Sequence, residues 1–102
     1  MSKAQSKSKT RSKTPQRRMA FSCEADEAQN VALVGSFNGW DPQRHPMTRK
    51  GRGPWQKTVL LAPGVYEYKF WIDGQWREDP RNAHTRPNPF GTVNSIVAVS
   101  AE

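Results

Sequence analysis

The stretch PGVYEYKFWIDGQW, residues 63–76, is the part of this chain that decides its fold. Apolar or aromatic side chains occupy every second position from Tyr66 to Ile72, which is the period of a β-strand with one buried face. The alternate face carries Lys69. Asp73-Gly74 is a strong signal for a two-residue hairpin, so residues 75–78 are expected to return as a second strand.

Other short segments on either side also have strand character and are separated by turn-forming residues. They comprise residues 19–23, 31–34, 47–49, 55–61 and 92–99. Cys23 falls on the apolar side of the first segment and is expected to be a buried core thiol. Residues 79–89 contain three prolines and no apolar period, so they are expected to form a loop. About seven short strands without a helical period predict an all-β, immunoglobulin-like sandwich.

The N-terminal residues differ in composition from the rest of the chain. Residues 1–18 contain seven Lys or Arg and no acid, which accounts for the whole net charge of +7. They carry almost no apolar surface, so we expect a disordered basic tail over 1–18 and a folded domain over 19–102. The tail could serve as a solubilising leader, as an electrostatic tether to a polyanion, or as a site of phosphorylation.

Composition also restricts the class of protein. The single cysteine cannot form an intramolecular disulfide, and no apolar run is long enough for a membrane span or a signal peptide. The cytoplasm is therefore the expected location, with no membrane partner. An organellar transit peptide is the alternative, but the basic N-terminal segment lacks the apolar residues of an amphipathic helix. The neutral remainder gives no reason to expect a phosphate-binding face.

Three segments together resemble the glycogen-binding domain of the AMP-activated protein kinase β subunit. They are GSFNGWD at 35–41, the stretch at 63–76, and GTVNS at 91–95. The same pattern occurs in carbohydrate-binding module family 48 and in the early-set domains of branching enzymes and isoamylases. The similarity spans about residues 28–100. It implies an early-set, immunoglobulin-like sandwich that binds α-glucan, as glycogen, starch or malto-oligosaccharide, across one face.

The resemblance also implies a set of carbohydrate-binding residues, namely Trp40, Lys69, Trp76, Phe90, Thr92 and Asn94. Phe90 departs from the family pattern, which has leucine at this position. The chemistry of these side chains agrees with the resemblance, because a pyranose ring needs flat aromatic platforms together with hydrogen-bond donors and acceptors. Trp71 is a candidate for a peripheral contact, while Trp55 is expected to pack in the core.

The residues alone leave a structural interpretation open for each member of this set. A tryptophan in a β-rich domain usually belongs to the core, and a strand lysine is usually a solvated charge. Thr92 and Asn94 could instead satisfy the backbone of an edge strand.

No catalytic residue, cofactor or metal site is predicted. Glycoside chemistry needs two carboxyl groups flanking the scissile bond, but Asp73 fits a hairpin turn and Asp79 fits a loop. His45 and His84 are expected at the surface, without the spacing of metal ligands. The alternative to glucan binding is a protein-interaction or scaffold module, which could regulate a glucan-metabolising enzyme in trans. Its basic tail would then bind an acidic partner or nucleic acid.

Overall fold

The computed structural model describes residues 15–101, and these form an all-β sandwich, as the sequence predicts. The elements in chain order are β1 (Arg17–Cys23), β2 (Val31–Gly35), the 3-10 turn η1 (Ser36–Asn38), β3 (Trp55–Leu61), β4 (Gly64–Ile72), β5 (Gln75–Arg77), β6 (Thr85–Pro87) and β7 (Val93–Val99). Residues 1–14 of the tail predicted to be disordered lie outside the described part of the chain. The prediction is wrong for Arg17 and Arg18, which belong to β1.

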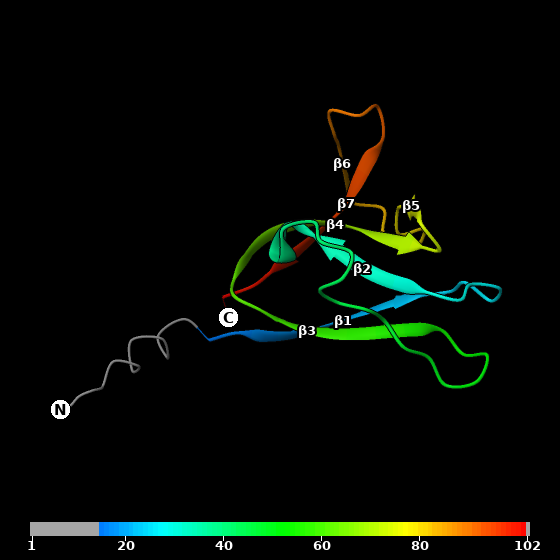
Figure 1. Ribbon diagram of the computed structural model, residues 1–102. Coiled ribbons are helices and arrows are strands. Elements are labelled where there is room, and N and C mark those ends of the chain that lie inside the picture. The colour runs from blue at the N-terminus through cyan, green and yellow to red at the C-terminus, as the bar shows by residue number, and fades with distance from the viewer. Residues whose placement is uncertain (1–14, 102) are drawn as a thin grey trace.

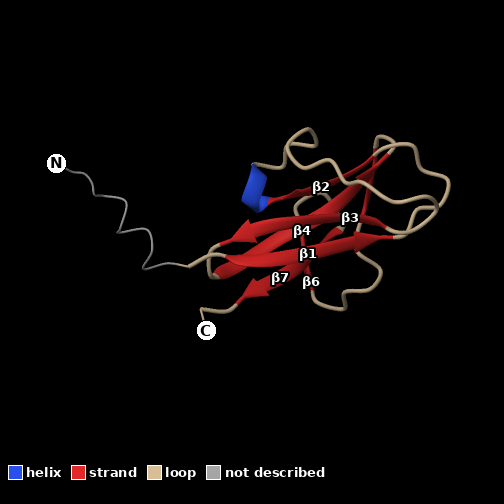
Figure 2. Ribbon diagram, turned by 90° about the horizontal axis from the view of Figure 1, so that it is seen from below, coloured by secondary structure: helices blue, strands red, loops and turns tan. Residues whose placement is uncertain are grey.

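The strands form two antiparallel sheets that pack face to face. The smaller sheet pairs β1 with β3, and the larger has the order β2-β4-β7-β6, with β5 also paired to β4. Figure 1 shows β1 and β3 as a separate layer beneath the larger sheet, and Figure 2 shows them from below, in front of β4 and β7. β4 is the central strand, because it pairs with β2 along one edge and with β5 and β7 along the other.

The core lies between the two sheets and follows the predicted alternation. Phe21 and Cys23 of β1 face Tyr68 and Phe70 of β4, and the rings of Phe21 and Tyr68 meet edge to face at 5.0 Å. Each buried aliphatic or aromatic side chain of this kind contributes about 1.5–3 kcal/mol through the hydrophobic effect. Trp55 belongs to the same core, and the burial predicted for Cys23 is confirmed.

Apart from shifts of a single residue, the strands differ from the sequence prediction in three places. β1 begins at Arg17 rather than at residue 19, because the backbones of Arg17 and Arg18 continue the ladder with β3 whatever their side chains. Residues 47–49 make only the isolated bridge of Thr48 with Gln56 and no strand. Conversely, the expected loop at 79–89 contains β6, an exposed strand paired with β7; an edge strand with no buried side chain has no apolar period to reveal it.

Residues 15–101 contain no helix that is long and apolar enough to span a membrane.

Candidate functional site

A tight turn after β2 brings the first tryptophan to the outer face of the larger sheet. Gly35 lies against β4 so closely that a Cβ there would stand 2.6 Å from the Glu67 carbonyl oxygen. The buried Asn38 side chain holds the turn by accepting from the Gly35 amide and donating to the Leu33 carbonyl. Gly39 and Trp40 then adopt left-handed backbone conformations, with φ of 68° and 60°. The chain reverses, and the Trp40 amide donates to the Gly35 carbonyl at 3.0 Å.

A second tryptophan meets the first from the β4–β5 hairpin. Trp71 and Trp76 are paired across this hairpin, and their ring centroids are 4.6 Å apart. The ring centroids of Trp40 and Trp76 are 6.3 Å apart, and the two ring planes are inclined at 71°. Trp76 remains 47% exposed, so its indole offers an apolar surface to solvent. Trp71 packs against Trp76.

The loop of residues 88–92 is organised by a single asparagine. The Asn88 side chain donates to Thr92 Oγ1 at 2.8 Å and to Asn94 Oδ1 at 2.9 Å. Its own oxygen accepts from the amides of Phe90 and Thr92, which completes the hydrogen-bonding capacity of the side chain. Phe90 is left at the tip of this loop and is 87% exposed. Phe90 and the half-exposed Trp76 line the same pocket, so exposed aromatic surface is gathered at one place on the domain.

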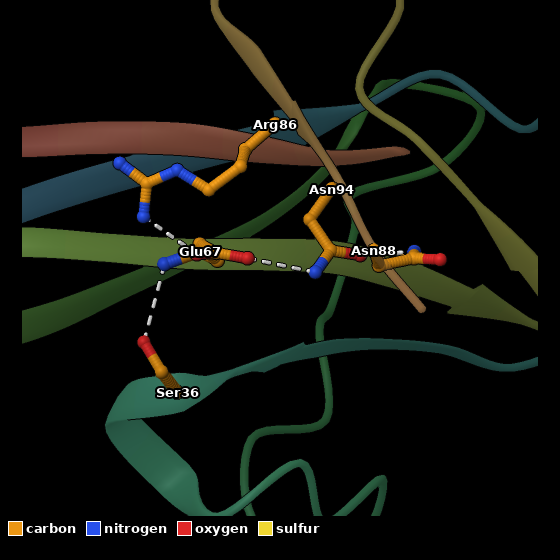
Figure 3. A network of polar contacts seen from close by, with 5 residues as sticks. All are labelled: Ser36, Glu67, Arg86, Asn88 and Asn94. Atoms are coloured by element: carbon orange, nitrogen blue, oxygen red, sulfur yellow. Dashed lines mark hydrogen bonds and ion pairs between the residues drawn. The ribbon is translucent and has the colours of Figure 1, made fainter. Parts of the chain in front are cut away.

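Polar side chains form a continuous row between this loop and β4. Lys69 Nζ donates to Thr92 Oγ1 at 2.9 Å, and Asn94 Nδ2 donates to Glu67 Oε1 at 2.9 Å. Arg86 of β6 pairs with the other oxygen of Glu67 at 2.8 Å. Figure 3 shows Glu67 at the centre of this row, between Arg86, Asn94 and the hydroxyl of Ser36. The hydrogen bond from Asn94, together with Arg86, lowers the pKa of Glu67, so this carboxyl is ionised at neutral pH.

The polar row, apart from Arg86, borders one pocket of about 730 Å³, a size typical of small-ligand sites. Its lining contains all six residues singled out from the sequence, together with four others: Ser36, Trp40, Glu67, Lys69, Trp76, Asn88, Pro89, Phe90, Thr92 and Asn94. The structure therefore brings together residues that are up to 54 positions apart in the chain, counting from Trp40 to Asn94.

The sequence pattern did not single out Glu67, Asn88 or Ser36, which also line the pocket. Glu67 lies two residues before Lys69 on the same strand, so the alternation of β4 places both on one face. That signal was available for Glu67, whereas no periodicity marks Asn88 or Ser36. Lys69 is 8% exposed, which contradicts the alternative interpretation of this residue as a solvated strand charge.

The remaining candidate acids and histidines have structural surroundings. Asp73 accepts from the backbone amides of Gln29 and Asn30, and Asp79 accepts from the Tyr68 hydroxyl at 2.6 Å. His45 is not at the surface as expected: it is half-buried, its ring meets Phe37, and its Nδ1 lies 2.8 Å from Asn38 Nδ2. Within residues 15–101, no group of three or more His, Cys, Asp or Glu is placed to hold a metal ion.

A second hollow of about 580 Å³ is lined in part by Asp41, Gln43, Trp55 and Trp71. None of the six residues picked out from the sequence borders it.

Residues 19–102 match the family model described as the glycogen recognition site of AMP-activated protein kinase. The chain is 41% identical over 76 residues to the protein FLOURY ENDOSPERM 6, chloroplastic, of Oryza sativa subsp. japonica, which covers 74% of this chain and 14% of that protein. It is 38% identical over 71 residues to 5'-AMP-activated protein kinase subunit beta-1 of Rattus norvegicus, covering 70% of this chain and 25% of the subunit.

A bacterial relative is named as an enzyme. The chain is 42% identical over 52 residues to the 1,4-alpha-glucan branching enzyme GlgB 2 of Xanthomonas campestris pv. campestris (strain 8004), covering 51% of this chain and 7% of that enzyme. The chain thus spans a quarter or less of the length of these three relatives.

Proposed function

The chain belongs to the family of glycogen recognition sites of AMP-activated protein kinase, and from this we propose that it binds α-1,4-glucan and catalyses no reaction itself. The observation that carries the proposal is the pocket on the larger sheet. It combines exposed aromatic rings with a row of hydrogen-bonding side chains, the two features that a sugar ring requires.

In the proposed complex, Trp40 and Trp76 stack against the C–H faces of glucose rings. Phe90, at the opposite rim, presses on the same chain of sugars from the tip of its loop. Lys69, Thr92 and Asn94 lie between these aromatic walls and bind the hydroxyl groups. Because the pocket is open and holds few residues, the affinity for a short oligosaccharide should be weak, with a Kd of roughly micromolar to millimolar.

A regulatory role beside a glucan-metabolising enzyme is a second proposal, and the relatives favour it. One of them is named as a branching enzyme and another as a kinase subunit, and this chain matches only a small part of each. A domain of this kind would hold an enzyme on its polymer. The competing hypothesis is an interaction or scaffold module that binds no sugar. Native affinity electrophoresis with glycogen separates this hypothesis from glucan binding.

The test is native affinity electrophoresis in gels with and without glycogen. Wild-type protein should be retarded by glycogen, whereas Trp76→Ala should migrate as it does in the empty gel, since a central aromatic contact contributes about 2 kcal/mol or more. The matched control is Leu60→Ala, which removes an exposed apolar side chain from β3 of the smaller sheet. Glycogen should retard this variant like the wild type. Equal retardation of a folded Trp76→Ala protein would contradict the proposed site.

A further inference from the structure

The hydrogen bonds already made inside the pocket limit what each side chain can still offer to a ligand. Thr92 Oγ1 accepts from both Lys69 Nζ and Asn88 Nδ2, so both of its lone pairs are occupied. Its remaining capacity is one O–H donor. Lys69 has no lone pair in its ammonium form and can only donate. These two residues therefore present donors alone.

Asn94 is restricted in the same way. One of its N–H groups is donated to Glu67, and one lone pair of its oxygen is occupied by Asn88. A single donor and a single acceptor position remain. Glucose hydroxyls each carry a proton that also needs an acceptor, because a buried O–H without a partner loses its hydrogen bond to water. The residues expected from the sequence thus leave the pocket short of acceptors.

Glu67 supplies the missing acceptors. Each of its carboxylate oxygens accepts one recorded hydrogen bond, from Asn94 on Oε1 and from Arg86 on Oε2, and each oxygen has room for another. Among residues 15–101, it is the one acid that borders this pocket. We propose that Glu67 is itself a ligand of the glucan, accepting a hydrogen bond from a glucose hydroxyl through its carboxylate. This inference rests on the proposed function of the same pocket.

The carboxylate is held in place before any ligand arrives. The backbone amide of Glu67 donates to Ser36 Oγ at 3.1 Å, and the side chain is fixed by Arg86 of β6 and Asn94 of β7 (Figure 3). A preorganised acceptor binds more tightly than a mobile one, because less side-chain freedom is lost on binding. A negative charge at this position also suits a neutral polyol, and it disfavours anionic ligands despite the presence of Lys69.

The first measurement is calorimetric titration of wild type, Glu67→Gln and Glu24→Gln with maltoheptaose. Glutamine keeps the length of the side chain and one oxygen for Asn94 but loses the charged acceptor, so the affinity should fall by about tenfold, as expected for a hydrogen bond to a charged group. Glu24→Gln is the matched control, because it makes the same change in an exposed ion pair, with Arg81, that does not border the pocket. It should bind within about twofold of wild type, since an exposed ion pair contributes little.

The second measurement pairs the variant with altered sugars, using methyl α-maltotriosides that each lack one secondary hydroxyl. The sugar without the hydroxyl bound by Glu67 should bind wild type several-fold more weakly than the parent sugar, and this difference should disappear in Glu67→Gln. Wild-type affinity in Glu67→Gln, or equal losses in both proteins for every deoxy sugar, would overturn the role of Glu67. If Trp76→Ala has meanwhile lost binding, the glucan site stands without this contact. A wild type that binds no maltoheptaose would overturn both proposals.

Discussion

Replacing Asn88 by alanine should release the loop of residues 88–92 from the pocket while leaving the sandwich folded. The substitution removes four hydrogen bonds, two donated to Thr92 and Asn94 and two accepted from the amides of Phe90 and Thr92. A net hydrogen bond contributes about 0.5–1.5 kcal/mol, and these groups regain water when the loop opens, so we take the low end and expect about 2 kcal/mol in total. If this cost falls on binding, the affinity for maltoheptaose decreases about 30-fold.

Two measurements on the same variant separate this effect from general destabilisation. Calorimetric titration gives the affinity, and amide hydrogen exchange reports whether Phe90 and Thr92, whose N–H groups bind Asn88, have lost protection. Asn82→Ala is the control, because it removes hydrogen bonds to the Tyr68 hydroxyl and the Ile96 carbonyl away from the pocket. It should lower the free energy of unfolding with little change in affinity. Unchanged affinity in Asn88→Ala, together with faster exchange of both amides, would refute the link between loop order and binding.

Three further predictions concern residues outside the pocket. Gly35→Ala should lower the free energy of unfolding by about 1–3 kcal/mol in urea titrations, because the new Cβ meets the Glu67 carbonyl oxygen at 2.6 Å; a change within error would show that the turn adjusts freely. Burial, followed by repulsion from Lys57 and Arg44, lowers the pKa of His45 below its ordinary 6.5, so its contribution to stability is present above that pH and is lost as the pH falls below it. Urea unfolding at pH 7.5 and 5.5 should therefore show a larger loss for wild type than for His45→Gln, and equal losses would contradict this. Burial raises the pKa of Cys23, so its thiol should react with a disulfide reagent only after unfolding, which absorbance measures; rapid reaction of the native protein would argue against the packed core.

The sequence predicted best where a strand has one buried face. The alternation in β1 and β4 identified the core side of each, and the Asp73-Gly74 turn located the hairpin. β6 could not be found in this way, because its three residues are all exposed and its pairing with β7 is a property of the backbone. Residues 47–49 show the opposite error: their composition suits a strand, but only a single bridge forms there.

The candidate pocket divides along similar lines. The six residues taken from the family resemblance lie together around it, which spacing alone does not predict. Glu67 and Asn88 escaped notice because their importance lies in hydrogen bonds to side chains from other parts of the chain, such as Asn94, 27 residues beyond Glu67. A linear sequence gives the position of a carboxylate on a strand, but the unused lone pairs become visible only after the partners are known.

The inclination of the two indole rings has a consequence for the shape of polymer that fits. Planes of Trp40 and Trp76 that meet at 71° cannot both lie flat against a straight ribbon, such as a chain of β-1,4-linked glucose. A chain that turns from one glucose to the next can offer a ring face to each of them, and α-1,4 linkage produces such a turning chain. If the pocket binds glucan as proposed, the angle between the two tryptophans should therefore favour storage polysaccharide over cellulose by curvature, although both consist of the same sugar.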